Sequence, residues 1–358
     1  MMRDRGGQAP SDALDARDAA ILAVIIREHV LTGEPIGSLT VSRDGRLGLS
    51  PATIRAAMAS LEDRGYLHQP HTSAGRVPTA RAYRSHVDGL TGCPRMAPEQ
   101  ARVIESALLE AGGEVRALLE EASRQLSRLS RQVGLVLAPE VGRLLVDRVE
   151  FVRLDDRRVV AILIGRSGLV HHRLLPVEDP ISQPELDRMG RYLSDEFGGR
   201  TLPEMRELLQ RKLSEERARY DAWLRSSLQL AHRALDSDSD SVGGGLIVDG
   251  ASNLLEVPEF NDPERMRGLL RALEEKKVLV ELLGRVLDGQ GVQVLIGEED
   301  PSWDLDQCSL VASTYGSGGR RMGTVGIVGP TRMEYPRAIA LVDTLARVLS
   351  RMFSPVGN

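Results

Sequence analysis

The stretch from Leu49 to Arg84, LSPATIRAAMASLEDRGYLHQPHTSAGRVPTARAYR, constrains the fold of this chain more than any other segment. Ser50 can cap a helix with its side-chain oxygen, and Pro51 suits the first helical turn, where its missing N–H costs no hydrogen bond. Apolar residues then recur at helical spacing, which predicts one face packed against a core. These residues are Ile54, Met58 and Leu61.

The opposite face of this predicted helix carries mostly small side chains. A helix that enters the major groove of DNA needs short or hydrogen-bonding side chains opposite its buried stripe, close to its N-terminus. The residues that meet this description are Ser50, Ala52, Thr53, Arg55 and Ala56. A plain core helix can open with the same Ser-Pro pair, so this segment alone leaves both interpretations open.

A short hairpin is predicted after the helix. Residues 66–69 and 76–78 can form two strands around a turn at 70–75 that contains a flexible glycine, Gly75. Side chains near this turn and in the following helix can hydrogen-bond phosphates. They are His71, Ser73, Arg76 and Arg84. A solvated hairpin tip would have a similar composition.

Two helices are predicted before this stretch. Residues 14–33 show helical spacing of apolar residues and end on a glycine, and residues 38–48 supply a short second helix. Ser38 and Thr40 of the short helix are further candidate DNA contacts. Three helices followed by a hairpin are typical of a winged helix-turn-helix, so we expect a DNA-binding domain over residues 1–92, of which 1–11 form a tail.

The charge of the whole chain does not point to nucleic acid, because the net charge is −5. The local balance of charge is different, since residues 41–86 contain seven arginines and three acidic residues. Guanidinium groups suit bidentate contacts with phosphate and guanine. A general preference for arginine over lysine explains the usage equally well, but it does not explain the clustering.

The length and composition of the chain restrict the class of protein to which it can belong. A chain of 358 residues is long enough for two or three domains. It has no apolar run of the length that spans a membrane, and its start lacks the apolar core of a secretory signal. Only two cysteines are present, Cys93 and Cys308, so a disulfide framework is not expected. We expect a cytoplasmic protein that does not enter the membrane.

The middle of the chain predicts mixed secondary structure. A long amphipathic helix is expected over 99–132, with a kink at Gly112 and Gly113. An antiparallel meander is expected to follow, with strands at 144–154, 157–164 and 169–175. Later strands are expected at 292–296, 308–314 and 321–328, with helices at 263–274 and 276–287 and a final C-terminal helix. The expected fold class is therefore α+β.

Residues 181–245 differ from their surroundings because they carry almost no strand signal. We expect one helix over 183–197 and a second, longer helix over 203–235. The second helix has an apolar stripe that could form a dimer contact or pack within its own subunit, and both interpretations stay open. The stripe includes Leu209, Leu213, Tyr220, Leu224 and Leu228.

The common catalytic and cofactor motifs are absent from the sequence, so we expect no enzyme, no metal and no cofactor. The run GSGGRRMG at 316–323 could cradle a phosphate, but a tight hairpin between strands is the favoured interpretation. His171 and His172 point to opposite faces of a predicted strand and cannot chelate one metal together. The acidic run at 236–245 is interpreted as a solvated loop rather than a cation site.

Several long strings resemble those of one family. LSPATIR, LHQPHTSAGRVPTARAYR, GASNLLEVPEF and GTVGIVGPTRMEYPRAIALVD look like the HrcA family, the heat-inducible transcription repressors of bacteria. The resemblance extends from about Leu14 to Phe353. It implies a winged helix-turn-helix domain, a GAF-like domain over 99–180 plus 246–358, and a dimerising domain inserted into it at 181–245.

The resemblance also implies partners. Members of the family bind, as homodimers, an inverted-repeat operator called CIRCE upstream of chaperone operons of the groEL/groES and dnaK type, and the chaperonin GroEL promotes the active repressor. This chain departs from the family pattern at Ala56, Ala57 and Leu39, which suggests a variant operator or weaker binding. The alternative is a paralogue with a different regulon, in which the GAF-like domain senses a small molecule.

Overall fold

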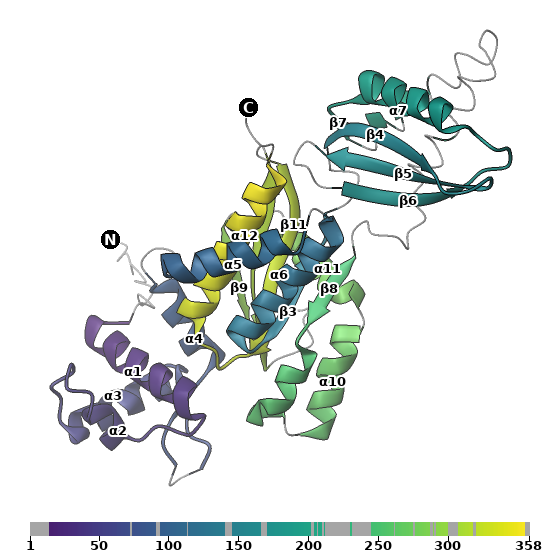
Figure 1. Cartoon of the computed structure of the whole chain (residues 1–358). Helices are drawn as coiled ribbons and strands as arrows, with labels where there is room; N and C mark the ends of the chain where they lie inside the picture. Colours follow the sequence, from purple (N-terminus) through teal and green to yellow (C-terminus); the bar gives the residue numbers. More distant parts are fainter. Residues whose placement is uncertain are drawn as a thin grey trace, which may run out of the picture. The chain divides into compact units, whose positions relative to one another are not determined.

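The computed structural model describes most of the chain (Figure 1). The described residues are 14–71, 74–90, 94–112, 114–139, 145–165, 170–201, 204–205, 207–209, 211, 230, 245–260, 262–274, 276–286, 289, 291–299, 307–317 and 320–354. Two compact units are present. The first is Met1–Cys93 with Pro330–Pro336, and the second is Pro94–Gly329 with Arg337–Asn358.

The first unit contains four helices and a small hairpin. In chain order these are α1 (Ala16–Thr32), α2 (Ser38–Ser42), α3 (Pro51–Asp63), β1 (Leu67–His68), β2 (Val77–Pro78) and α4 (Ala80–Asp88). The strands β1 and β2 pair antiparallel, and an isolated bridge joins Ile36 to Arg76. The helices and the hairpin appear where the sequence predicts them, although both strands are shorter than expected.

Side-chain caps explain why these helices begin where they do. The side chain of Asp15 accepts from the N–H of Asp18 at the start of α1, and Thr79 accepts from Ala82 at the start of α4. At the end of α1, Gly33 adopts a φ of +75°, a conformation that favours glycine. Local hydrogen bonds and backbone conformation therefore account for these helix boundaries.

The second unit opens with two helices rather than one. The predicted helix over 99–132 is divided into α5 (Pro98–Glu110) and α6 (Val115–Ser130). Between them Gly112 has a φ of +88°, which an α-helix does not accommodate. The sequence indicated a kink at this point, and the structure shows a full break.

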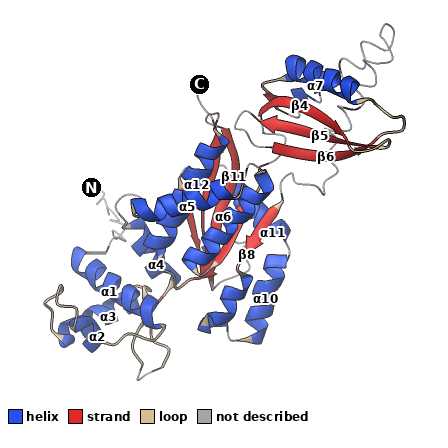
Figure 2. Cartoon of the chain, in the orientation of Figure 1, coloured by secondary structure: helices blue, strands red, loops and turns tan. Residues whose placement is uncertain are grey.

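A five-stranded sheet follows, with the order β8-β3-β11-β10-β9. Its strands are β3 (Val133–Leu137), β8 (Leu246–Asp249), β9 (Val292–Ile296), β10 (Cys308–Ser317) and β11 (Arg320–Pro330). The helices α10 (Pro263–Glu274) and α11 (Lys276–Val286) contribute to a hydrophobic core with one face of the sheet. Short 3-10 helices lie at Ala251–Glu256, Pro258–Phe260 and Gly297–Glu299. Figure 2 shows this mixture of helix and strand.

The other face of the five-stranded sheet is covered by α6 and by α12 (Tyr335–Phe353). A Cβ atom at Gly134 of β3 would lie 2.3 Å from the carbonyl oxygen of Ser123 in α6, so only glycine permits this close approach. On β10 the ring of Tyr315 contacts Phe353 of α12, with centroids 5.3 Å apart. Arg337 of α12 donates to the carbonyl of Leu129 in α6 at 3.1 Å.

A separate four-stranded sheet has the order β6-β5-β4-β7. Its strands are β4 (Leu145–Arg153), β5 (Arg158–Gly165), β6 (Val170–Pro176) and β7 (Arg200–Thr201), and α7 (Gln183–Phe197) packs against it. The side chains of Ser194 and Gln183 on α7 bond to backbone groups of β4 at Val149, Phe151 and Arg153. The helix therefore satisfies an edge of the sheet that would otherwise be open to pairing.

The strands of the predicted meander lie in this separate sheet, while the domain division expected at residue 180 stays a prediction. The strands of 145–176 do not join the sheet formed by 246–330, because they pair with β7 and share a core with α7. Residues 145–201 thus form a four-stranded sheet with a helix packed against it. The expected helix over 203–235 lies largely outside the described residues.

Candidate nucleic-acid interface

The third helix, α3, divides cleanly into a buried and an exposed face. Ile54 and Leu61 are fully buried and Met58 nearly so, whereas Ala52, Arg55 and Ala56 are exposed. Ser50 accepts from the N–H of Thr53, and the hydroxyls of these two residues lie 2.9 Å apart. Near the well-capped N-terminus the exposed face is therefore two alanines around one arginine, and it continues with Ala59, Ser60 and Asp63.

Two of the departures from the family pattern face solvent and one does not. Ala57 is only 7% exposed and packs inside the unit, so its side chain belongs to the core. Ala56 is exposed on α3, and Leu39 of α2 is 62% exposed. Only these last two positions present a changed surface. Ser38 and Thr40 flank Leu39, half-buried and exposed respectively.

The hairpin turn holds an exposed His71 beside α3, while Ser73 lies outside the described residues. Gly75 is not the flexible tip that the sequence suggested. A Cβ atom there would lie 2.5 Å from the backbone carbonyl of Ile36, so glycine is needed for close packing rather than for freedom. The hairpin is held against the segment that connects α1 and α2.

Arg76 braces the hairpin instead of projecting from it. Its backbone exchanges two hydrogen bonds with Ile36, of 2.9 and 2.8 Å. Its guanidinium forms an ion pair of 2.8 Å with Glu62 in the last turn of α3, and its side chain is only 20% exposed. The guanidinium of Arg76 is therefore engaged with α3 in this structure, and its contact with DNA stays a prediction.

The remaining arginines divide into structural and exposed members. Arg64 and Arg81 lie over the ring of Tyr66, at 5.5 and 4.8 Å from its centroid, and Arg81 also donates to the carbonyl of Arg64. Arg84 is partly exposed, with an ion pair of 3.5 Å to Asp88. The exposed arginines of the cluster are Arg43, Arg46, Arg55 and Arg81.

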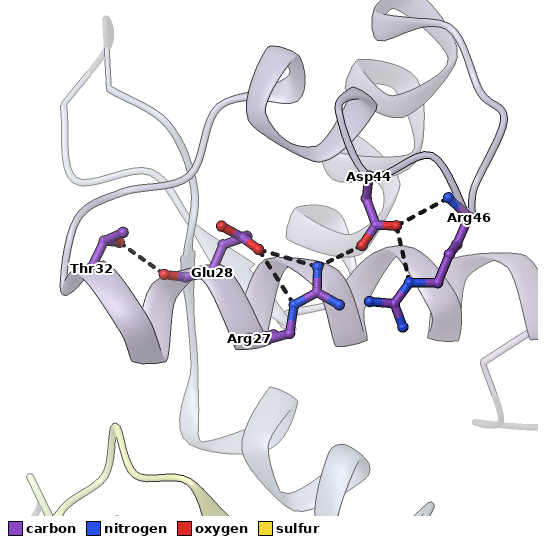
Figure 3. Close-up of polar contacts among 5 residues, drawn as sticks. All are labelled: Arg27, Glu28, Thr32, Asp44 and Arg46. Carbon is purple, nitrogen blue, oxygen red and sulfur yellow. Dashed lines mark hydrogen bonds and ion pairs between the residues drawn. The ribbon is translucent and has the colours of Figure 1, made fainter.

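A polar network fixes the loop between α2 and α3 to the first helix. Figure 3 shows Asp44 between two guanidinium groups, 2.5 Å from Arg27 and 3.5 Å from Arg46. The hydrogen bond from Arg27, together with one from the backbone N–H of Arg46, holds the pKa of Asp44 below its usual value. Because Asp44 stays ionised, the loop that leads into α3 is held in one place.

The segment Pro330–Pro336 belongs to this first unit, although it lies far away in the sequence. Arg332 donates to the carbonyl of Val30 at 2.8 Å, and the rings of Tyr335 and Tyr83 lie 5.8 Å apart. Together with α1, His86 and the loop at 44–47, residues 333–336 line a groove of about 560 Å³. Burial lowers the pKa of His86 in this groove. The sequence offered no signal for this contact.

Comparison with known proteins identifies the family of this chain. The family described as HrcA protein C terminal domain matches residues 116–339. The chain belongs to the HrcA family. A heat-inducible transcription repressor HrcA of Geobacter sulfurreducens is 41% identical over 95% of this chain and 98% of that protein. The HrcA repressors of Syntrophobacter fumaroxidans and Xanthomonas campestris are 37% and 38% identical, over 96% and 99% of this chain and 99% of each relative.

A solved structure shares the fold of this HrcA family member. A crystal structure of a hypothetical protein superposes with a TM-score of 0.64 at 23% identity, over 95% of this chain and 99% of that one. In the described part of the chain, no group of three or more potential metal ligands is present, and no helix is long and apolar enough to cross a membrane.

Of the five expected dimer residues, Leu209 lies in the described part of the chain. Leu209 is fully buried in the core beneath the four-stranded sheet, so it cannot form a surface contact. Leu213, Tyr220, Leu224 and Leu228 lie outside the described residues. The four-stranded sheet itself carries exposed apolar side chains on the face that does not form this core: Val152 (39% exposed), Leu154 (55%) and Leu174 (51%).

Proposed function

We propose that this chain is a DNA-binding transcription repressor of heat-inducible chaperone genes. Relatives that match over nearly their full length are named heat-inducible transcription repressor HrcA, which supports the proposal. The observation that carries the proposal is the exposed face of α3, where Arg55 lies between Ala52 and Ala56 on a helix whose other face is buried. Small side chains allow the backbone to approach bases, and one guanidinium can then make a bidentate contact with guanine.

The first unit is proposed to act as a winged helix-turn-helix. In this arrangement α3 enters the major groove, where Thr53 and Arg55 lie near its capped start. Further contacts to phosphates are proposed for Ser38, Thr40, His71, Ser73 and Arg84. Arg76 has a supporting role, because its ion pair with Glu62 fixes the hairpin to α3. Contacts to phosphates thus position the first unit on the DNA, whereas contacts from α3 to the bases provide sequence specificity.

We further propose a homodimer on an inverted-repeat operator of the CIRCE type. A two-fold symmetric dimer places two copies of α3 on two half-sites, which matches the symmetry of an inverted repeat. The open face of the four-stranded sheet supports the dimer. Val152 pairs with Val160 across β4 and β5, and Val160 pairs with Leu174 across β5 and β6, so apolar side chains form a row on that face.

The five-stranded sheet with helices on both faces is proposed to be the GAF-like domain that the family resemblance implies. Modulation by the chaperonin GroEL is proposed on the same resemblance. Its direct test is the addition of GroEL to the purified repressor, with DNA binding as the measurement. An increase in the fraction of active repressor supports the proposal, and unchanged binding contradicts it.

The proposed function is tested by a titration of duplex DNA that carries the inverted repeat found upstream of the chaperonin genes of the same organism. The matched control is a duplex of equal composition with one half-site scrambled. Binding should be tighter on the intact repeat and should weaken steeply as salt increases, because phosphate contacts release counterions. Equal affinity for both duplexes at all salt concentrations would rule out sequence-specific recognition.

A further inference from the structure

The segment Pro330–Pro336, which we name the strap, joins β11 to the body of α12 but packs in the first unit. Arg332 of the strap donates to the carbonyl of Val30 in the last turn of α1, at 2.8 Å. Cations at a helix C-terminus satisfy carbonyls that have no partner within the helix and interact favourably with its dipole. The strap therefore caps α1 from outside.

The fit between the strap and the end of α1 is close. A Cβ atom built at Gly33 would lie 3.4 Å from the guanidinium carbon of Arg332, an ordinary contact distance, so this side chain lies against the turn that ends α1. Met333 is 4% exposed and Tyr335 is 1% exposed. The hydroxyl of Tyr335 donates to the carbonyl of Thr331 at 2.9 Å, which keeps the strap folded on itself while its ring contacts Tyr83.

A series of contacts connects the capped end of α1 with α3, the helix that is proposed to contact the bases. His29 of α1 is hydrogen-bonded through its Nδ1 to the carbonyl of Glu34, at 2.9 Å. Two residues later, Ile36 exchanges backbone hydrogen bonds with Arg76 of the hairpin. Arg76 in turn forms its ion pair with Glu62 at the end of α3. Each step is a direct contact, so a shift at Arg332 has a physical route to α3.

The strap does not seal the unit completely. The groove of about 560 Å³ lies between α1 and strap residues 333–336, and one of its lining side chains, Leu31, is 73% exposed. An incompletely packed contact loses less on separation than a filled core does. The contacts at Arg332 and Tyr335 therefore contribute to the hold of the strap on the first unit.

We propose that the strap is a releasable coupling device that sets the DNA-binding competence of the first unit. With Arg332 on α1, the turn at 33–36, the hairpin and α3 are held in the arrangement that binds the operator. Because both ends of the strap continue into β11 and α12, a change in those elements can pull it away. This inference rests on the proposed function, since its output is DNA binding.

The test compares Arg332→Ala with the wild-type chain by hydrogen exchange and by operator binding. Exchange of the backbone amides of residues 33, 34, 36, 37, 76 and 77 should increase, and affinity for the inverted repeat should fall by about fivefold or more, the usual lower end of coupling between sites. Arg332→Lys, which keeps a cation and donors, should restore much of both. Arg347→Ala is the matched control, because it removes an exposed arginine of α12 that pairs with Asp343 and leaves the strap contacts intact.

A second variant keeps the test independent of one substitution. Tyr335→Leu retains apolar bulk but removes the ring contact with Tyr83, and it should raise exchange in the same segments. Unchanged exchange of the same amides in both variants overturns the strap proposal, as does unchanged operator affinity. If wild-type protein binds no DNA, the proposed function fails instead, and the exchange measurements still decide whether the strap holds the hairpin.

Discussion

The guanidinium of Arg76 lies 2.8 Å from a carboxylate oxygen of Glu62, which joins the hairpin to the last turn of α3. This pair separates two roles that the sequence made indistinguishable. An arginine beside a glycine at a hairpin tip can serve a phosphate or a neighbouring carboxylate. Here the carboxylate holds it, so the orientation of α3 and the position of the hairpin depend on each other.

Loss of this ion pair should destabilise the first unit. Arg76→Ala is expected to reduce the free energy of unfolding by about 1 kcal/mol, because the pair is partly screened by solvent while the backbone bridge to Ile36 is retained. Urea denaturation measures the change. Arg84→Ala removes a more exposed pair on α4 and should cost about 0.3 to 0.5 kcal/mol. An equal cost for the two variants would contradict the bracing role.

Gly75→Ala should disturb the same hairpin by a steric route. The added methyl group would meet the backbone of Ile36 at 2.5 Å, and backbone atoms cannot turn aside as a flexible side chain can. The expected cost is about 1 to 3 kcal/mol, as for other overpacked sites. Gly45→Ala provides the control, because a Cβ atom there has no neighbour within 4 Å. Thermal unfolding of the two variants should differ clearly.

Much of the first unit could be predicted from the sequence because its signals are local. The Ser50 cap, the proline that follows it and the buried stripe of α3 all act within a few residues. The hairpin followed from turn residues between short apolar segments. The sequence also indicated where the long helix of the second unit is interrupted, although Gly112 divides this helix fully where only a kink was expected.

The remaining features depend on contacts that no local pattern encodes. The bond between Arg332 and Val30 spans 302 positions, so nothing near either residue announces it. An apolar stripe is the same whether it faces a partner or its own sheet, which is why Leu209 was assigned to a dimer surface and lies in a core. The pattern of residues 145–176 correctly predicted an antiparallel meander. Which other strands pair with this meander depends on tertiary contacts, so the local pattern does not determine it.

Acid should weaken the first unit through His86. Burial lowers the pKa of this imidazole below its ordinary value of 6.5, so the unfolded chain binds the proton more readily. Stability is therefore fully present above pH 6.5 and is lost as pH falls through the folded-state pKa. Hydrogen exchange of α1 and α4 amides between pH 7 and 5 should show this loss.

The histidine variant makes that dependence specific. His86→Gln should flatten the pH response of α1 and α4. His171→Gln provides a control in the second unit, because burial also lowers the pKa of His171 there. If His86→Gln leaves the pH response of the first unit as steep as in the wild type, the titrating group lies elsewhere.

Arg55→Ala should weaken operator binding without unfolding the unit. The side chain is exposed, so its removal leaves the core intact. The expected cost is about 1 to 3 kcal/mol on the intact inverted repeat, with little change on non-specific DNA, as for a direct contact to a base. Fluorescence anisotropy at fixed salt measures both. Arg17→Ala on α1 removes an equally exposed arginine away from α3, and a similar loss in that control would argue for general electrostatics.

The open face of the four-stranded sheet should control assembly. Leu174 is 51% exposed and lies in register with Val160, which in turn pairs with Val152. Leu174→Asp places a carboxylate in this apolar row, and burying that charge against a second copy without a partner would cost several kcal/mol, about enough to dissociate a modest dimer. Sedimentation velocity should then show monomers. Leu31→Asp makes the same substitution at a leucine that is 73% exposed in the first unit, and it should leave the dimer intact. A dimer that survives Leu174→Asp but not Leu224→Asp would place the interface on the segment beyond β7 instead.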